Sequence, residues 1–96
     1  MGAETFFRAA EGRTADEAFR TAKEDARHMH GHGGYSGTIA EKTNFTLIFV
    51  PLGKDPRDFA NELIDSDDRR ISNKWGPAGC IALGHGRFLF FGWASS

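Results

Sequence analysis

Two segments of the sequence are predicted β-strands with apolar side chains at almost every position: FTLIFV at 45–50 and RFLFFGWA at 87–94. Successive side chains of a strand point to opposite faces of the sheet, so in the first segment Leu47 and Ile48 already face opposite sides. A sheet with one face in water would show apolar–polar alternation instead. The chain therefore has to cover both faces of its sheet.

Cap and turn signals predict the remaining elements. A 3.6-residue apolar stripe after Thr14 predicts one helix, and Asp55-Pro56 is typical of the start of a second. The predicted order is β-α-β-β-α-β-β, with strands at 5–10, 35–42, 45–50, 79–83 and 87–94. With right-handed crossovers, this order predicts an α+β, ferredoxin-like sandwich, with an irregular α+β fold as the alternative. Two helices would then lie on one face of an antiparallel five-stranded sheet with strand order 5-4-1-3-2.

The second face of such a sheet needs its own cover. A second copy of the chain is the simplest cover, and we therefore expect a homodimer. A chain of 96 residues buries only roughly 60–65% of its unfolded surface, so association would also help to stabilise it. Long loops of the same chain are the alternative cover.

Composition narrows the class of protein. The length predicts a single α+β domain at 1–96, and the high aromatic content excludes a disordered chain. The net charge of −1 leaves no basic excess for general nucleic-acid binding, and no apolar stretch is long enough to cross a membrane. Cys80 is the only cysteine, so no internal disulfide can form and the cytoplasm is the expected compartment. Its apolar strand makes Cys80 a core residue rather than a nucleophile.

The glycine-rich segment after the first helix is the first candidate binding site. Its backbone N–H groups could turn toward an anion, and its hydroxyl groups could add hydrogen bonds. These candidate residues are Gly33, Gly34, Ser36 and Thr38. The predicted topology places Lys54, Arg87 and the start of the second helix at the same end of the sheet, which favours a phosphate-bearing or nucleotide-like ligand. Glycines that only permit tight turns are the simpler alternative.

The polar segment 65–78 is the second candidate. Trp75 offers an aromatic plane on which a base or a sugar could stack, and Arg70 could hold a phosphate. The predicted topology puts this segment at the opposite end of the sheet from the glycine-rich one. A solvated, self-paired charge cluster with Trp75 folded back on the core is the alternative.

Histidines are the third candidate. His28, His30 and His32 alternate around the end of the first helix, and the predicted topology brings His85 to the same end of the sheet. Imidazole binds zinc and can act as an acid or a base. However, alternate histidines next to glycines have no defined ligand spacing, and no H-E-x-x-H motif accompanies them. We therefore expect solvated histidines, no metal and no cofactor.

Three segments carry a resemblance to known proteins: GGYSGTIAEK at 33–42, KWGPAG at 74–79 and FLFFGWA at 88–94. They are similar to small uncharacterised proteins of bacteria and their phages. The resemblance implies no activity. Because small phage proteins are often inhibitors or sequestering factors, it implies a binding role by analogy.

Together these patterns predict a homodimeric binding protein without catalysis of its own. Its ligand would be a small anion or a nucleotide-like molecule, and its role that of a sequestering or inhibitory factor of the phage type. One alternative is a small enzyme in which His30, His32 and His85 are acid–base groups or metal ligands. The other is a protein–protein inhibitor that acts through the loop of Trp75.

Overall fold

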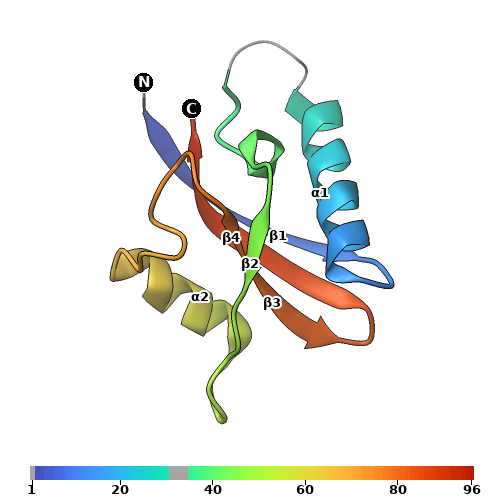
Figure 1. Cartoon of the computed structure of the whole chain (residues 1–96), viewed down its shortest axis with the longest axis vertical. Coiled ribbons are helices and arrows are strands. Elements are labelled where there is room, and N and C mark those ends of the chain that lie inside the picture. Colours follow the sequence, from blue (N-terminus) through green and yellow to red (C-terminus); the bar gives the residue numbers. More distant parts are fainter. Residues whose placement is uncertain (1, 31–34) are drawn as a thin grey trace.

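The computed structural model describes residues 2–30 and 35–96. Within these ranges the chain forms a four-stranded sheet that lies between two α-helices (Figure 1). The elements are β1 (Ala3–Glu11), α1 (Ala15–His30), the 3-10 helix η1 (Ile39–Glu41), β2 (Phe45–Leu47), α2 (Pro56–Asp65), β3 (Ala78–Gly84) and β4 (Arg87–Ser95).

Both α-helices begin at the predicted caps. The Glu17 N–H donates to Thr14 Oγ1 at 3.2 Å at the start of α1. At the start of α2, the Asp55 carboxylate accepts from the N–H groups of Arg57 and Asp58. Each cap satisfies backbone donors that have no partner inside the helix. The two predicted helices are therefore confirmed.

The sheet is mixed, with strand order β1-β4-β3-β2. β4 runs antiparallel to β1 and to β3, whereas β2 pairs with β3 in parallel. The predicted five-stranded antiparallel sheet with order 5-4-1-3-2 is therefore wrong. Two differences matter most: β4 is a central strand instead of an edge strand, and β1 is an edge strand paired with β4 instead of a central strand between β3 and β2.

The predicted strand at 35–42 does not form. Instead, the Thr38 hydroxyl accepts from the Ala40 N–H at 3.2 Å and caps η1, and the Lys42 N–H closes it by donating to the Ile39 carbonyl. Ser36 is held by the Glu41 side chain. These local hydrogen bonds satisfy groups that a strand would offer to a neighbour, so the side chains outcompete sheet formation here.

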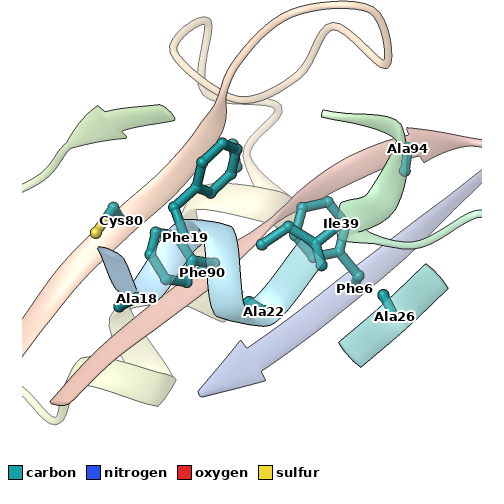
Figure 2. Close-up of a cluster of buried hydrophobic side chains, with 10 residues drawn as sticks. Phe6, Ala18, Phe19, Ala22, Ala26, Ile39, Cys80, Phe90 and Ala94 are labelled. Carbon is teal, nitrogen blue, oxygen red and sulfur yellow. The ribbon is translucent and has the colours of Figure 1, made fainter. Parts of the chain in front are cut away.

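The two helices pack on opposite faces of the sheet. α1 packs Phe19 against Phe90, as Figure 2 shows, whereas α2 packs Leu63 in a second cluster with Leu89 and Phe91. The topology explains this arrangement. The connection through α1 runs from one edge strand, β1, to the other, β2, and the connection through α2 runs back to β3. Right-handed crossovers in opposite directions place their helices on opposite faces. The prediction of both helices on one face is wrong.

The opposite placement explains why β4 is apolar on both sides. Phe90 is covered by α1, and Phe91 is covered by α2 together with Ile71, which comes from the loop between α2 and β3. The same chain thus covers the second face with a helix and a long loop, which was the alternative to a second copy. An uncovered sheet face therefore gives no argument for a homodimer.

Candidate functional site

The candidate site lies at the end of the sheet where residues 2 and 96 meet. The Gly37 N–H donates to the Ser95 carbonyl at 2.7 Å, which fixes the segment after α1 beside the end of β4. Lys74 Nζ donates to the Gly2 carbonyl at 3.3 Å, which brings the loop before β3 to the same end. Figure 1 shows η1, this loop and both ends of the chain together there.

Lys42 anchors the loop before β3. Its side chain is buried, and Nζ donates to three backbone carbonyls, those of Asn73 at 3.3 Å, Lys74 at 3.2 Å and Gly76 at 2.9 Å. An ammonium group has three N–H donors, so each carbonyl can take one. Burial lowers the pKa of Lys42 to about 8. One buried side chain therefore fixes the backbone of the loop before β3.

Two exposed aromatic rings meet at this anchored loop: Trp75 belongs to the loop, and Tyr35 comes from the segment after α1. The rings of Tyr35 and Trp75 meet edge to face, with centroids 5.5 Å apart at 76°, and their side chains remain 48% and 57% exposed. Lys74 Nζ lies 5.4 Å from the centroid of the Trp75 ring. The backbone N–H of Trp75 donates to Asn73 Oδ1 at 2.9 Å, which fixes the backbone that carries the indole. We call Tyr35, Lys74 and Trp75 the aromatic platform.

The platform corrects two sequence expectations. Trp75 does not fold back on the core, because more than half of it is exposed. Nor does its loop lie at the opposite end of the sheet from the glycine-rich segment, because Trp75 touches Tyr35, which directly follows Gly34. The second error comes from the predicted hairpin of 35–42 with 45–50, which reversed the direction of 45–50. In the structure 35–42 forms no strand, and β2 runs parallel to β3.

The hydroxyl groups proposed for anion binding are already engaged. Ser36 Oγ lies 2.7 Å from Thr38 Oγ1 and donates to Glu41 Oε2 at 2.8 Å, and the Ser36 N–H donates to the same carboxylate oxygen at 3.0 Å. The Glu41 carboxylate thus takes the place of the anion that these donors would bind. Gly33 and Gly34 lie outside the described residues, so their predicted role stays a prediction.

A hollow of about 290 Å³ opens between β1 and the segment 36–39. Its charged lining groups are Glu4 and Arg8, one carboxylate and one guanidinium. Arg8 Nη2 also contacts Met29 Sδ at 3.8 Å. Because the two charges are opposite, the hollow is not a dedicated anion pocket.

The cations predicted for an anion pocket lie elsewhere. Lys54 stands at the far end of β2 and pairs with Glu62 at 2.8 Å. Arg87 begins β4, whereas the segment 36–39 lies beside its end at Ser95, roughly 27 Å away along the strand. The structure therefore does not bring Lys54 or Arg87 together with Ser36 and Thr38.

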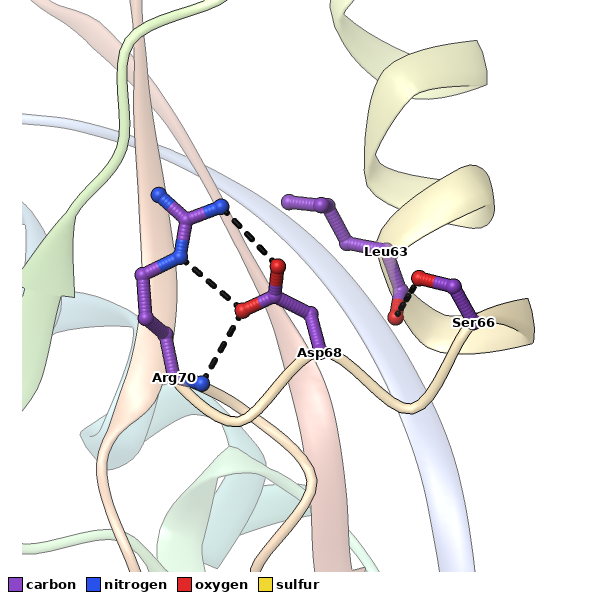
Figure 3. Close-up of polar contacts among 4 residues, drawn as sticks. All are labelled: Leu63, Ser66, Asp68 and Arg70. Atoms are coloured by element: carbon purple, nitrogen blue, oxygen red, sulfur yellow. Dashed lines mark hydrogen bonds and ion pairs between the residues drawn. The ribbon is translucent and has the colours of Figure 1, made fainter.

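Arg70 is also engaged. Its guanidinium donates to both carboxylate oxygens of Asp68, at 2.9 and 3.1 Å (Figure 3). These hydrogen bonds lower the pKa of Asp68 below its usual value and raise that of Arg70. The charge cluster of the loop is thus self-paired at this position, as the simpler alternative predicted. A ligand phosphate at Arg70 would have to compete with the Asp68 carboxylate.

Among the described histidine side chains, those of His28 and His85 lie far apart. His85 lies in the hairpin between β3 and β4, at the opposite end of β4 from the segment that follows α1. His28 is exposed on α1, and the side chain of His30 and all of His32 lie outside the description. Over residues 2–30 and 35–96, the structure contains no cluster of three or more His, Cys, Asp or Glu that could hold a metal ion.

Cys80 is a core residue, as predicted. It is buried beneath α1, and burial raises the pKa of its thiol to about 12. A thiol is a poor nucleophile until it loses its proton, so this side chain is inert at neutral pH.

Sequence reasoning missed Tyr35, Lys42 and Lys74. Lys42 sits in the polar run EKTN, where a lysine is usually a surface residue, and nothing local marks it as buried. Its role depends on carbonyl groups more than thirty positions away, at Asn73, Lys74 and Gly76.

Comparisons with protein-family models, with curated proteins and with solved structures found no match. The resemblance to small bacterial and phage proteins therefore stays a prediction. In the described part of the chain, no helix combines the length and the apolar character needed to span a membrane.

Proposed function

We propose that this chain is a binding protein without catalysis of its own, and that its aromatic platform takes a ligand with a planar ring and an anionic group, as a nucleotide has. The supporting observation is an exposed indole on a loop that a buried lysine holds in place. Such a ring loses little conformational entropy when a ligand stacks on it, because it is already fixed.

The chemistry of the platform suits such a ligand. The exposed surface of Trp75 can stack with a ring, which is worth roughly 1–3 kcal/mol for a nucleic-acid base. Lys74 Nζ lies over the Trp75 ring, 5.4 Å from its centroid, so its positive charge is within reach of a phosphate or carboxylate of a ligand bound at this indole. Tyr35 closes one side of the indole through its edge-to-face contact. The combination favours a weak ligand complex, in the micromolar to millimolar range.

The other proposed functions have less support. A histidine-based enzyme requires His85 close to the segment after α1, and the two lie at opposite ends of β4. We keep the cytoplasm as the proposed compartment, because the only cysteine is a buried thiol. A sequestering role of the phage type rests on analogy alone.

A titration followed by tryptophan fluorescence tests the proposal. The indole nitrogen of Trp93 is buried and has no hydrogen-bond partner in the described structure, so Trp93→Phe removes no hydrogen bond and leaves Trp75 as the single tryptophan. In this background we expect adenosine monophosphate to quench the fluorescence saturably, while inorganic phosphate alone does not.

Two matched lysine variants locate the ligand. Lys74→Met should weaken nucleotide binding about tenfold, which corresponds to the loss of roughly one charge-assisted contact. Lys54→Met removes a lysine at the other end of the sheet and should leave binding unchanged. A titration that shows no quenching at millimolar nucleotide, or an effect of Lys54 rather than Lys74, contradicts the proposal.

A further inference from the structure

β2 leaves one edge of the sheet open. It is the last strand in the order β1-β4-β3-β2, so only β3 pairs with it among the described elements. α1 places Phe19 against Phe45 on one face of this strand, and Ile48 packs in the cluster of α2 on the other face, so the helices cover its faces and not its outer edge. The outer edge of β2 is therefore accessible to another strand.

Large apolar side chains follow this open edge. Leu47 is 53% exposed, Phe49 is 88% exposed and Leu52 is fully exposed. No charged residue occurs from position 43 to position 53. Edge strands are usually protected from association by charges, proline or bulges within the strand. Here Pro51 comes only after the exposed Phe49, so the edge is unprotected.

The backbone groups of alternate residues point away from the sheet. The Asn44 carbonyl accepts from the Ala78 N–H, and the Ile48 N–H donates to the Cys80 carbonyl, so even-numbered residues direct their groups toward β3. Because the direction alternates along a strand, the N–H and C=O groups of Phe45 and Leu47 point outward. The proposal extends this alternation past the end of β2 to Phe49.

From these observations we propose that two copies of the chain associate by antiparallel pairing of β2 with β2. A two-fold axis at Leu47 places this residue opposite the partner's Leu47, and Phe45 opposite the partner's Phe49. Every outward N–H and C=O of these residues then has a partner, and Pro51, which lacks an N–H, ends the ladder. The homodimer thus forms through the edge of the sheet and not through its face.

The size and the charge of the patch fit a second copy. Burying the exposed parts of Leu47, Phe49 and Leu52 removes roughly 400–500 Å² per subunit, or roughly 800–1,000 Å² in total, which is at the lower limit for a specific interface. An uncharged strand offers nothing to select a charged peptide, and it creates no repulsion against itself. This area predicts a dimer that forms at micromolar concentration.

The opposite edge of the sheet explains why association stops at two copies. β1 carries Glu4, Arg8 and Glu11, and charged side chains on an edge strand disfavour further pairing. A dimer joined through β2 would have a β1 at each outer edge. The two-fold arrangement is therefore closed, and we expect no larger assembly.

Sedimentation of the full chain over a wide concentration range tests the proposal. We expect a monomer–dimer equilibrium at micromolar concentration, which Leu47→Lys should weaken at least tenfold because two like charges then face each other. Met29→Lys is the matched control, because Met29 is similarly exposed on α1 and should not affect association. A strict monomer at several hundred micromolar, or a dimer that Leu47→Lys leaves intact, overturns the proposal.

A charge-swap experiment tests the register. Leu47→Lys and Leu47→Glu should each be monomeric, and an equimolar mixture should form a heterodimer because opposite charges then face each other. Circular dichroism of each variant confirms folding before the mixture is measured. Folded variants that do not associate when mixed contradict a two-fold axis at Leu47.

Discussion

The aromatic platform and the open edge both expose large apolar side chains, but they differ in what holds those side chains. Below the platform, Lys42 donates to three carbonyls of the loop, and the backbone N–H of Trp75 donates to Asn73. The side chain of Ile71, from the same loop, is packed in the core. At the open edge, Phe49 and Leu52 are exposed on a segment whose outer side no other strand of residues 2–30 and 35–96 pairs with.

The difference separates two kinds of recognition. A ring that is fixed before binding suits a small ligand, because little entropy is lost on stacking. A strand with unused donors and acceptors suits another strand, because its backbone supplies the hydrogen bonds. Exposure alone would assign the same role to both regions, and the contacts beneath them distinguish the roles.

The largest expected effect of a single substitution is at the support of the platform loop. Ile71→Ala removes a buried side chain and should lower the free energy of unfolding by roughly 2–5 kcal/mol, as measured by urea denaturation. Leu52→Ala at the open edge should change it by less than about 0.5 kcal/mol, because Leu52 has no core contact to lose. Equal losses of unfolding free energy for Ile71→Ala and Leu52→Ala would contradict the difference in packing between the two regions.

A smaller effect is expected at the anchor itself. Lys42→Met keeps an apolar stem but leaves the carbonyls of the loop before β3 without their donor, which should cost roughly 1–3 kcal/mol. Amide hydrogen exchange should become faster in residues 73–77 and stay unchanged in residues 45–49. Faster exchange in both regions would contradict a local anchor.

The smallest expected effect is the part of the pH dependence of stability that comes from Lys42, the anchor of the platform loop. Below pH 8 both the folded and the unfolded chain hold the proton of Lys42, so its contribution does not vary. Burial lowers its pKa from 10.5 to about 8 in the folded chain, so above pH 8 the unfolded chain binds more protons and the free energy of unfolding rises with pH.

The slope from this one group is at most about 1.4 kcal/mol per pH unit and ends near pH 10.5. Urea denaturation of the wild type and of Lys42→Met at about pH 7.5 and pH 9.5 isolates the effect as the difference between the two proteins. The buried thiol of Cys80, whose pKa is raised to about 12, lowers the stability of both proteins above pH 9 and cancels in that difference. Leu52→Ala, at the open edge, should keep the effect of Lys42. A fall in stability over this range that depends on Lys42 would contradict the direction of the pKa shift.

Local signals in the sequence predicted both α-helices and four of the strands, but they also predicted a strand at 35–42 that does not form, and they did not predict how the strands pair. The caps at Thr14 and Asp55 and the hairpin before Arg87 depend on residues a few positions apart, and all three are present. The parallel pairing of β2 with β3 depends on contacts across the whole of α2. Nothing in the apolar pattern of either strand encodes that direction, so the predicted topology was wrong.

The candidate site was predictable only in part. Trp75 was recognised because a tryptophan in a polar loop is conspicuous, and Ser36 because it follows glycines. Their placement required the direction of the chain after α1, which was wrong once residues 35–42 were assigned to a strand. The burial of Lys42 had no local signal at all, because its partners are distant backbone groups.

The central position of β4 sets the order of events during synthesis. β4 contributes Leu89 and Phe91 to one core and Phe90 to the other, and it is the only strand that joins β1 to the rest of the sheet. Neither core can close until residues 87–95 have left the ribosome. Until then the nascent chain exposes its apolar strands, so we expect folding of these elements to wait for β4 and to proceed in one cooperative step.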